Sequence, residues 1–121
     1  MTLREGVWEV SEIAVGGELV PPLIDREPLS LEVHEDRISG YSGVNRFMGP
    51  VEKGRPGLLA TTMMAGPPEL MAQEQAFLGF LAEYDDIEST PEGINLVREG
   101  VVVIALVPQR EPGDRTQSSK G

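Results

Sequence analysis

One helical stretch interrupts an otherwise strand-rich chain, and this arrangement limits the folds that the chain can adopt. Residues 68–84 open with proline and glutamate, which favour the first turn of a helix. The apolar side chains of this stretch gather on one arc of a helical wheel, whereas Gln73, Gln75 and Glu83 lie largely elsewhere. We therefore predict a single amphipathic helix that packs on a sheet. The apolar arc consists of Leu70, Met71, Phe77, Leu78, Leu81 and Ala82.

Alternating apolar residues and turn-forming residues predict strands on both sides of the helix. Trp8 and Val10 would share one face of the first strand. The run at 101–107 is continuously apolar, so we expect it to be central and buried. Together these patterns predict an α+β fold, with a mostly antiparallel sheet curled against one helix. The predicted strands are 7–10, 19–20, 29–34, 37–41, 46–52, 57–63, 85–90, 94–98 and 101–107.

The length of 121 residues suits one domain with a single hydrophobic core. We place this domain at residues 1–107. Residues 108–121 contain Pro, Gly, Ser, Gln and mixed charges, and offer nothing apolar to bury. Ordering them would cost chain entropy with little return, so we predict a disordered C-terminal tail.

The chain is acidic, with 20 Asp and Glu against 10 Lys and Arg and a formal net charge of -10. This balance repels phosphate backbones and anionic lipids, so we expect no nucleic-acid partner. The longest apolar run, 101–107, is far shorter than the roughly 20 residues of a membrane-spanning helix, so we expect no membrane insertion.

Few residues offer site chemistry. The absence of cysteine excludes disulfides, thiolate nucleophiles and cysteine-based zinc sites. His34, the single histidine, falls on the solvent side of a strand because Leu31 and Val33 occupy the other side. The acidic residues at 85–88 lack the glycine and distal glutamate of a calcium loop. We expect no metal site and no cofactor.

The first residues lack the basic and apolar regions of a signal peptide. With the absence of cysteine, this favours the cytoplasm, or the envelope if a leader was removed.

Three motifs follow one another along the chain. Residues 39–49 read Ser-Gly-x-x-Gly-x-Asn-x-Phe-x-Gly, residues 60–65 read Ala-Thr-Thr-x-Met-Ala, and Glu74 then lies within the predicted helix. With the order of strands and helix, these motifs make residues 7–107 resemble the META domain family, which includes the HslJ-type heat-shock protein. The resemblance implies an antiparallel sheet curved into a partial β-barrel around one helix. It also implies a non-catalytic, stress-related protein, and some members look like small lipoproteins that assist secretion assemblies.

The chain departs from that family at three positions. Many relatives carry cysteine where this chain has Val44 and Gly66, a pair suited to a disulfide, and their replacement fits a reducing cytoplasm. Relatives also tend to carry Arg or Lys where Met63 stands. Any role of that basic side chain is therefore lost here or transferred to Arg46.

Glu74 falls between Leu78 and Leu81 on the wheel, inside the apolar arc. Burying an unpaired carboxylate costs several kcal/mol, so we predict hydrogen bonds or an ion pair. The partners would come from Asn45 and Arg46 or from Thr61 and Thr62, and would form a structural clamp between helix and sheet. The alternative is a general acid or base whose pKa is raised by desolvation.

Four further residues suggest a ligand or interaction surface. Met63, Met64, Met71 and Phe77 could line a cavity, because methionine adapts to varied apolar partners, or they could simply fill the core. The preferred hypothesis is a non-catalytic interaction module that contacts an unknown protein. The alternatives are a carrier or sensor of a small apolar ligand held between helix and sheet, and an enzyme using Glu74 with Thr62 or Asn45. No nucleophile, base and orienting group can be assembled for an enzyme, so we predict none.

Overall fold

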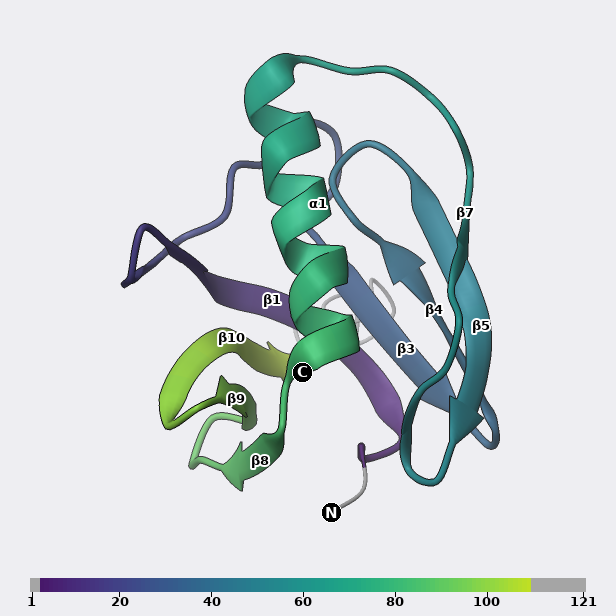
Figure 1. Ribbon diagram of the computed structural model, residues 1–121, viewed down its shortest axis with the longest axis vertical. Coiled ribbons are helices and arrows are strands. Elements are labelled where there is room, and N and C mark those ends of the chain that lie inside the picture. Colours follow the sequence, from purple (N-terminus) through teal and green to yellow (C-terminus); the bar gives the residue numbers. More distant parts are fainter. Residues whose placement is uncertain (1–2, 110–121) are drawn as a thin grey trace, which may run out of the picture.

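The computed structural model describes residues 3–109 of the chain. Within this range ten strands form one antiparallel sheet that curls into a half-barrel, and one helix packs on it (Figure 1). This confirms the predicted fold class. The strands before the helix are β1 (Gly6–Val15), β2 (Glu18–Val20), β3 (Ser30–His34), β4 (Arg37–Tyr41), β5 (Arg46–Glu52), β6 (Arg55–Pro56) and β7 (Ala60–Thr61). The helix is α1 (Pro68–Glu83), and β8 (Asp86–Ser89), β9 (Ile94–Arg98) and β10 (Val101–Pro108) follow it.

Strand β1 connects the two halves of the sheet. Its first residues pair with β3, the part from Trp8 to Ile13 pairs with β10, and its end pairs with β2. The sheet continues from β3 through β4 to β5, which also carries β6 and β7. On the other side it continues from β10 through β9 to β8. Figure 1 shows α1 lying across this curved sheet.

The hydrophobic core joins α1 to the sheet. Phe77 and Leu81 of α1 are fully buried, and the Phe77 ring packs edge-on against Phe47 with centroids 5.8 Å apart. Trp8 and Val10 are buried on one face of β1, as predicted. Burying apolar surface stabilises the fold by roughly 25 cal/mol per Å² of area removed from water. The side chains that the helix and the sheet bury together therefore hold the two elements together.

Strand β10 is central, as predicted, because β1 and β9 flank it. The predicted burial holds for only part of the strand. Ile104 and Leu106 lie in the core, but Val101 is 53% exposed. Successive side chains of a strand point to opposite faces, and here one face of the sheet remains open to solvent.

The predicted helix is confirmed, but its buried stripe is rotated from the predicted arc. Ala82 is exposed, whereas Gln73 is buried. The Gln73 amide is satisfied by main chain: its Oε1 accepts a hydrogen bond from Leu23 N at 2.8 Å, and its Nε2 donates to Leu23 O at 2.9 Å. A wheel that sorts by hydrophobicity cannot anticipate a polar side chain that is buried because its partners are supplied by a distant loop.

The strand predicted at 57–63 is wrong. Only β7 pairs there, through Phe47 with Thr61 and Met48 with Ala60. We call residues 57–67 the strap; outside β7 the strap runs irregularly along β5 towards α1 (Figure 1). Glycine and proline at both ends of the strap disfavour a longer ladder.

The described structure continues past residue 107, the predicted end of the domain. Strand β10 includes Pro108, and Gln109 N donates a hydrogen bond to Val7 O at 2.9 Å. Residues 110–121 of the predicted tail lie outside the described residues. In the described part of the chain, no helix combines the length and hydrophobicity required to cross a membrane.

Candidate functional site

The carboxylate of Glu74 is held by the loop between β4 and β5. Its side chain is only 5% exposed. Oε1 accepts hydrogen bonds from Ser42 Oγ at 2.7 Å, Asn45 N at 2.8 Å and Val44 N at 3.2 Å. Oε2 accepts one from Asn45 Nδ2 at 2.8 Å. Both oxygens of the carboxylate are therefore occupied by groups of the same chain.

These contacts set the ionisation of Glu74. Burial alone would raise its pKa, but the hydrogen bonds from Asn45, Ser42 and the backbone of Asn45 and Val44 outweigh burial and lower the pKa below the ordinary value. Glu74 is thus a carboxylate at neutral pH. This direction is opposite to the raised pKa that the general acid or base interpretation expects.

Asn45 extends the same network to the strap. Its side chain is 3% exposed. Oδ1 accepts hydrogen bonds from Met64 N at 2.7 Å and Thr62 Oγ1 at 2.8 Å, while Nδ2 also donates to Met64 O at 3.1 Å. One amide therefore joins α1, the β4–β5 loop and the strap. We call Ser42, Asn45, Thr62 and Glu74 the polar clamp.

The backbone of the β4–β5 loop explains the glycines of the first motif. Gly43 has φ of +118°, a conformation that side chains disfavour, and it lets the next amides turn towards Glu74. A Cβ at Gly40 would overlap the carbonyl oxygen of Ser30 and would lie 2.7 Å from Phe47 Cζ. The motif thus encodes a tight turn and a close approach of strands.

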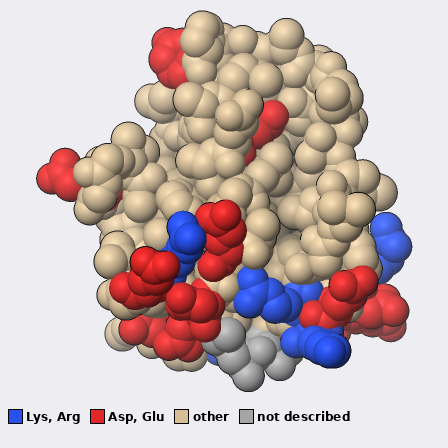
Figure 2. All heavy atoms as spheres, in the orientation of Figure 1, with Lys and Arg blue, Asp and Glu red and all other residues tan. Residues whose placement is uncertain are grey.

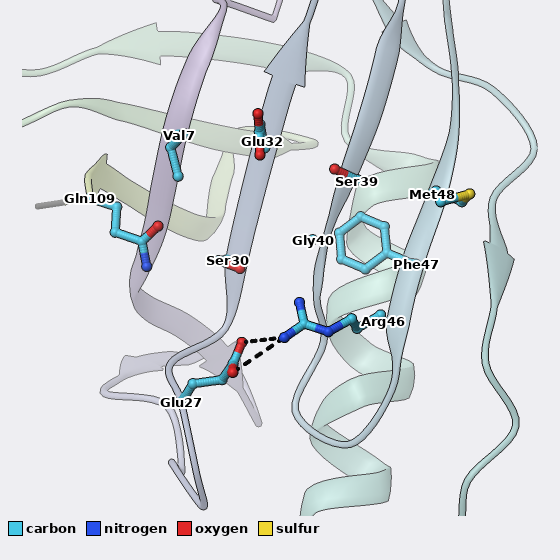
Figure 3. A pocket seen from close by; sticks show the side chains of 10 residues that line it. All are labelled: Val7, Glu27, Ser30, Glu32, Ser39, Gly40, Arg46, Phe47, Met48 and Gln109. Carbon is cyan, nitrogen blue, oxygen red and sulfur yellow. Dashed lines mark hydrogen bonds and ion pairs between the residues drawn. The ribbon is translucent and has the colours of Figure 1, made fainter. Parts of the chain in front are cut away.

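The structure brings together some of the predicted clamp residues and not others. Thr62 reaches Glu74 only through Asn45, and Thr61 is exposed in β7. Arg46 points away: its Nη2 lies 3.1 Å from Glu27 Oε1, and its guanidinium stacks on Tyr41. Figure 3 shows this ion pair at a hollow of about 360 Å³ on the face of the sheet away from α1.

Sequence reasoning missed Ser42. Its Oγ lies 2.7 Å from Glu74 Oε1 and 2.8 Å from Asn45 O, and its one proton goes to the stronger, charged acceptor. The available signal was its position inside the first motif, three residues before Asn45.

The four predicted surface residues do not line a common cavity. Phe77 is fully buried in the core, and Met71 is half-buried on α1. Met63 and Met64, on the strap, are 92% and 61% exposed. A ligand was predicted to lie between Met63, Met71 and Phe77. Phe77 is instead part of the packed core, and Met63 is exposed to solvent.

Val44 and Gly66, the two positions where the family resemblance implies cysteine, are neighbours. A Cβ built on Gly66 would lie 3.5 Å from Val44 Cβ and 2.8 Å from Val44 Cγ2. That separation suits a disulfide, and here the branched Val44 side chain fills the space instead.

An apolar groove of about 620 Å³ lies between α1 and the β1–β2 hairpin with the loop that follows it. Helix residues form one wall and hairpin and loop residues the other. The walls include Ala72, Ala76 and Phe80 on the helix and Val15, Val20 and Leu23 opposite. Among the residues at positions 3–109, no group of three or more His, Asp or Glu side chains is arranged to hold a metal ion.

The comparisons with known proteins agree with this architecture. The sequence model of the META domain matches residues 1–111. A protein from Burkholderia xenovorans, solved by NMR, superposes with a TM-score of 0.70 at 22% identity, over 88% of this chain and 83% of that one. At this identity the likeness shows the fold alone. No curated protein matches. Because the family match spans nearly the whole chain, the protein belongs to the META domain family.

Proposed function

We propose that this protein is a non-catalytic interaction module that acts in stress tolerance in the cytoplasm. The observation that carries the proposal is the exposure of Met63 and Met64 on a strap whose position is fixed by the polar clamp. Contact with a partner would bury these exposed apolar side chains, which is energetically favourable.

The strap is held firmly at the point where these side chains project. Met64 bonds Asn45 through both its N–H and its C=O, and Thr62 N donates to Arg46 O at 3.0 Å. Met48 of β5 and Leu58 of the strap are also exposed, at 53% and 90%. We call Met48, Leu58, Met63 and Met64 the methionine surface. Flexible thioether side chains adapt to partners of differing shape, which suits a module that meets stressed proteins.

The state of Glu74 supports a non-catalytic role. A general acid or base works best when its pKa is near the operating pH, whereas the pKa of Glu74 is lowered. Its oxygens are also occupied by Ser42, Val44 and Asn45. The family resemblance implies a cysteine pair where this chain has Val44 and Gly66. Val44 fills this space by packing, which, unlike a disulfide, does not depend on an oxidising environment, and this supports a reducing compartment.

Affinity capture from a lysate of heat-stressed cells tests the proposal. The intact chain should retain a specific, saturable partner, and the double variant Met63→Ser and Met64→Ser should lose it. Val101→Ser is the matched control, since Val101 is an exposed valine of β10 outside the methionine surface. The absence of any saturable partner, or equal capture by all three proteins, would contradict the proposal.

A carrier of a small apolar ligand is a second candidate. The groove between α1 and the β1–β2 hairpin, at about 620 Å³, has the size of small-molecule sites, which measure about 300–1,000 Å³. Its walls are mostly apolar, as such sites require.

A further inference from the structure

The apolar groove is preformed. Gln73 bonds both the N–H and the C=O of Leu23, so the helix itself holds the loop that forms the opposite wall. The helix wall of the groove includes the small side chains Ala72 and Ala76, which lie one turn apart. Figure 1 shows the β1–β2 hairpin projecting beside α1. An occupant would therefore enter without the protein having to open.

The apolar walls of the groove are exposed, and an exposed apolar residue lies next to them. Val15 and Leu23, which line the groove, are 56% and 51% exposed, and Ile24, which follows Leu23 on the loop after the hairpin, is 57% exposed. A small ligand that filled about 620 Å³ would leave Ile24 in water. A polypeptide could cover the groove and Ile24 together, as interfaces with an apolar centre do. The extent of the surface therefore favours a protein segment.

Charge restricts which segment fits. Glu69 is the one charged residue among the described residues that line the groove, and it is exposed. Glu18 and Asp25 are exposed on the hairpin and the loop after it, where, among the described residues, the exposed Arg26 is the one neighbouring cation, so acidic groups outnumber basic ones around the groove. Figure 2 shows acidic and basic groups gathered together in the lower half of the face in view, with a few isolated acidic groups above them. The surroundings of the groove therefore complement a basic partner.

The same charges disfavour other occupants. A second copy of the chain would bring another net charge of -10 to the contact. An anionic lipid surface is repelled for the same reason. Residues 110–121 include no apolar residue that could fill the groove.

We propose that the groove binds an apolar protein segment that carries lysine or arginine. Its apolar side chains pack between Ala72 and Ala76 on one side and Val20 and Leu23 on the other, and its cation pairs with Glu69. This proposal rests on the interaction role inferred above, but it uses a surface separate from the methionine surface.

Methyl NMR of the full chain tests the proposal with short synthetic peptides. The probe alternates leucine and lysine, and its two matched controls replace lysine by glutamate or leucine by serine. The leucine–lysine peptide should shift the methyl signals of Ala72, Ala76 and Val20 saturably. Both control peptides should bind roughly tenfold more weakly, because one loses the charge match and the other loses the apolar contact.

Four variants locate the binding. Ala76→Arg places a bulky cation in the groove and should abolish the shifts, whereas Ala82→Arg, on the same helix but exposed outside the groove, should leave them intact. Glu69→Gln should reduce the preference for the lysine peptide over the glutamate peptide. The methionine-surface double variant should bind the leucine–lysine peptide normally, so failure of this proposal and failure of the proposed function can be told apart.

Several results would overturn the proposal. The first is that the leucine–lysine peptide causes no saturable shift of the groove methyl signals. The second is that the glutamate peptide shifts them equally. The third is that octanol, as a small apolar ligand, shifts them and the peptide does not. Shifts that depend on protein concentration without peptide would assign the groove to a second copy. Shifts caused by deleting residues 110–121 would assign it to the chain's own end, and shifts caused only by anionic vesicles would assign it to lipid.

Discussion

Asn45 Nδ2 donates a hydrogen bond to Glu74 Oε2 at 2.8 Å, while Asn45 Oδ1 accepts one from Met64 N at 2.7 Å. The amide of Asn45 is thus oriented by a charge on one side and a main-chain donor on the other. Reversing the amide would put its oxygen against the carboxylate and its nitrogen against an N–H. The two motifs and the helical glutamate therefore meet at one buried side chain.

Removing the Glu74 carboxylate should destabilise the fold. Glu74→Ala leaves Ser42 Oγ and the N–H groups of Asn45 without their acceptor in a buried place, and we expect a loss of about 3 kcal/mol in the free energy of unfolding. Glu74→Gln should lose less but still lose stability, because its amide nitrogen cannot accept hydrogen bonds. Urea denaturation measures both.

Glu83→Ala is the matched control for these substitutions. Glu83 lies on the same helix and pairs with Arg98 at 3.1 Å, but both side chains are largely exposed, so we expect a change within about 1 kcal/mol. Unchanged stability in both Glu74 variants would show that the clamp does not hold the fold.

Glu74 should also make stability depend on pH. Its pKa is lowered on folding from the ordinary 4.5, so its contribution is complete above pH 4.5 and is lost as the pH falls through the folded value. Denaturation of the intact protein and of Glu74→Gln should be compared from neutral pH downwards. The difference in stability between the two should shrink as the pH falls below about 4.5, since the other carboxylates are common to both. A constant difference would contradict the lowered pKa.

Asn45→Ala should free the strap. The N–H of Met64 and the hydroxyl of Thr62 lose their acceptor, so hydrogen exchange at the Met64 amide should accelerate by more than it does in the core strands. Arg46→Ala is the control, because Arg46 is the next residue and its side chain lies outside the clamp. Equal protection of the Met64 amide in the intact protein and in Asn45→Ala would refute the anchoring role.

The sequence was informative where local pattern and tertiary structure agree. The helix and the hairpin of β3 and β4 were predictable from periodicity and turn residues, because their own residues supply the apolar face. The position of Glu74 inside an apolar arc was enough to predict a buried, partnered carboxylate. A wheel identifies the burial of a residue but not which distant donors satisfy it.

The features that were missed depend on contacts between distant segments. Gln73 is buried because of Leu23, fifty positions away, and the groove forms because small helix residues face the β1–β2 hairpin. Residues 57–63 of the strap were predicted to form one strand, but β5 pairs with the strap at only two positions in the described structure. No local pattern contains this information, because each feature depends on the packing of elements far apart in sequence.

Introducing cysteine at both Val44 and Gly66 should create a disulfide. The two Cβ positions are 3.5 Å apart, which is at the near end of disulfide geometry, and Val44→Cys removes the methyl branch that would crowd a side chain at Gly66. The bridge would tie the β4–β5 loop to the strap beside the clamp and restrict the unfolded chain. The oxidised double variant should therefore be about 3 kcal/mol more stable than its reduced form.

Mass spectrometry and urea denaturation with and without reductant measure this effect. Each single cysteine variant is a control, since neither can form the bridge within one chain. Gly66→Ala should lower stability by about 1 kcal/mol, because its methyl group would lie 2.8 Å from Val44 Cγ2 and overpack the site. A double variant that remains reduced under oxidising conditions would show that the two positions are not neighbours in solution, and would remove the structural basis for linking Val44 and Gly66 to a reducing compartment.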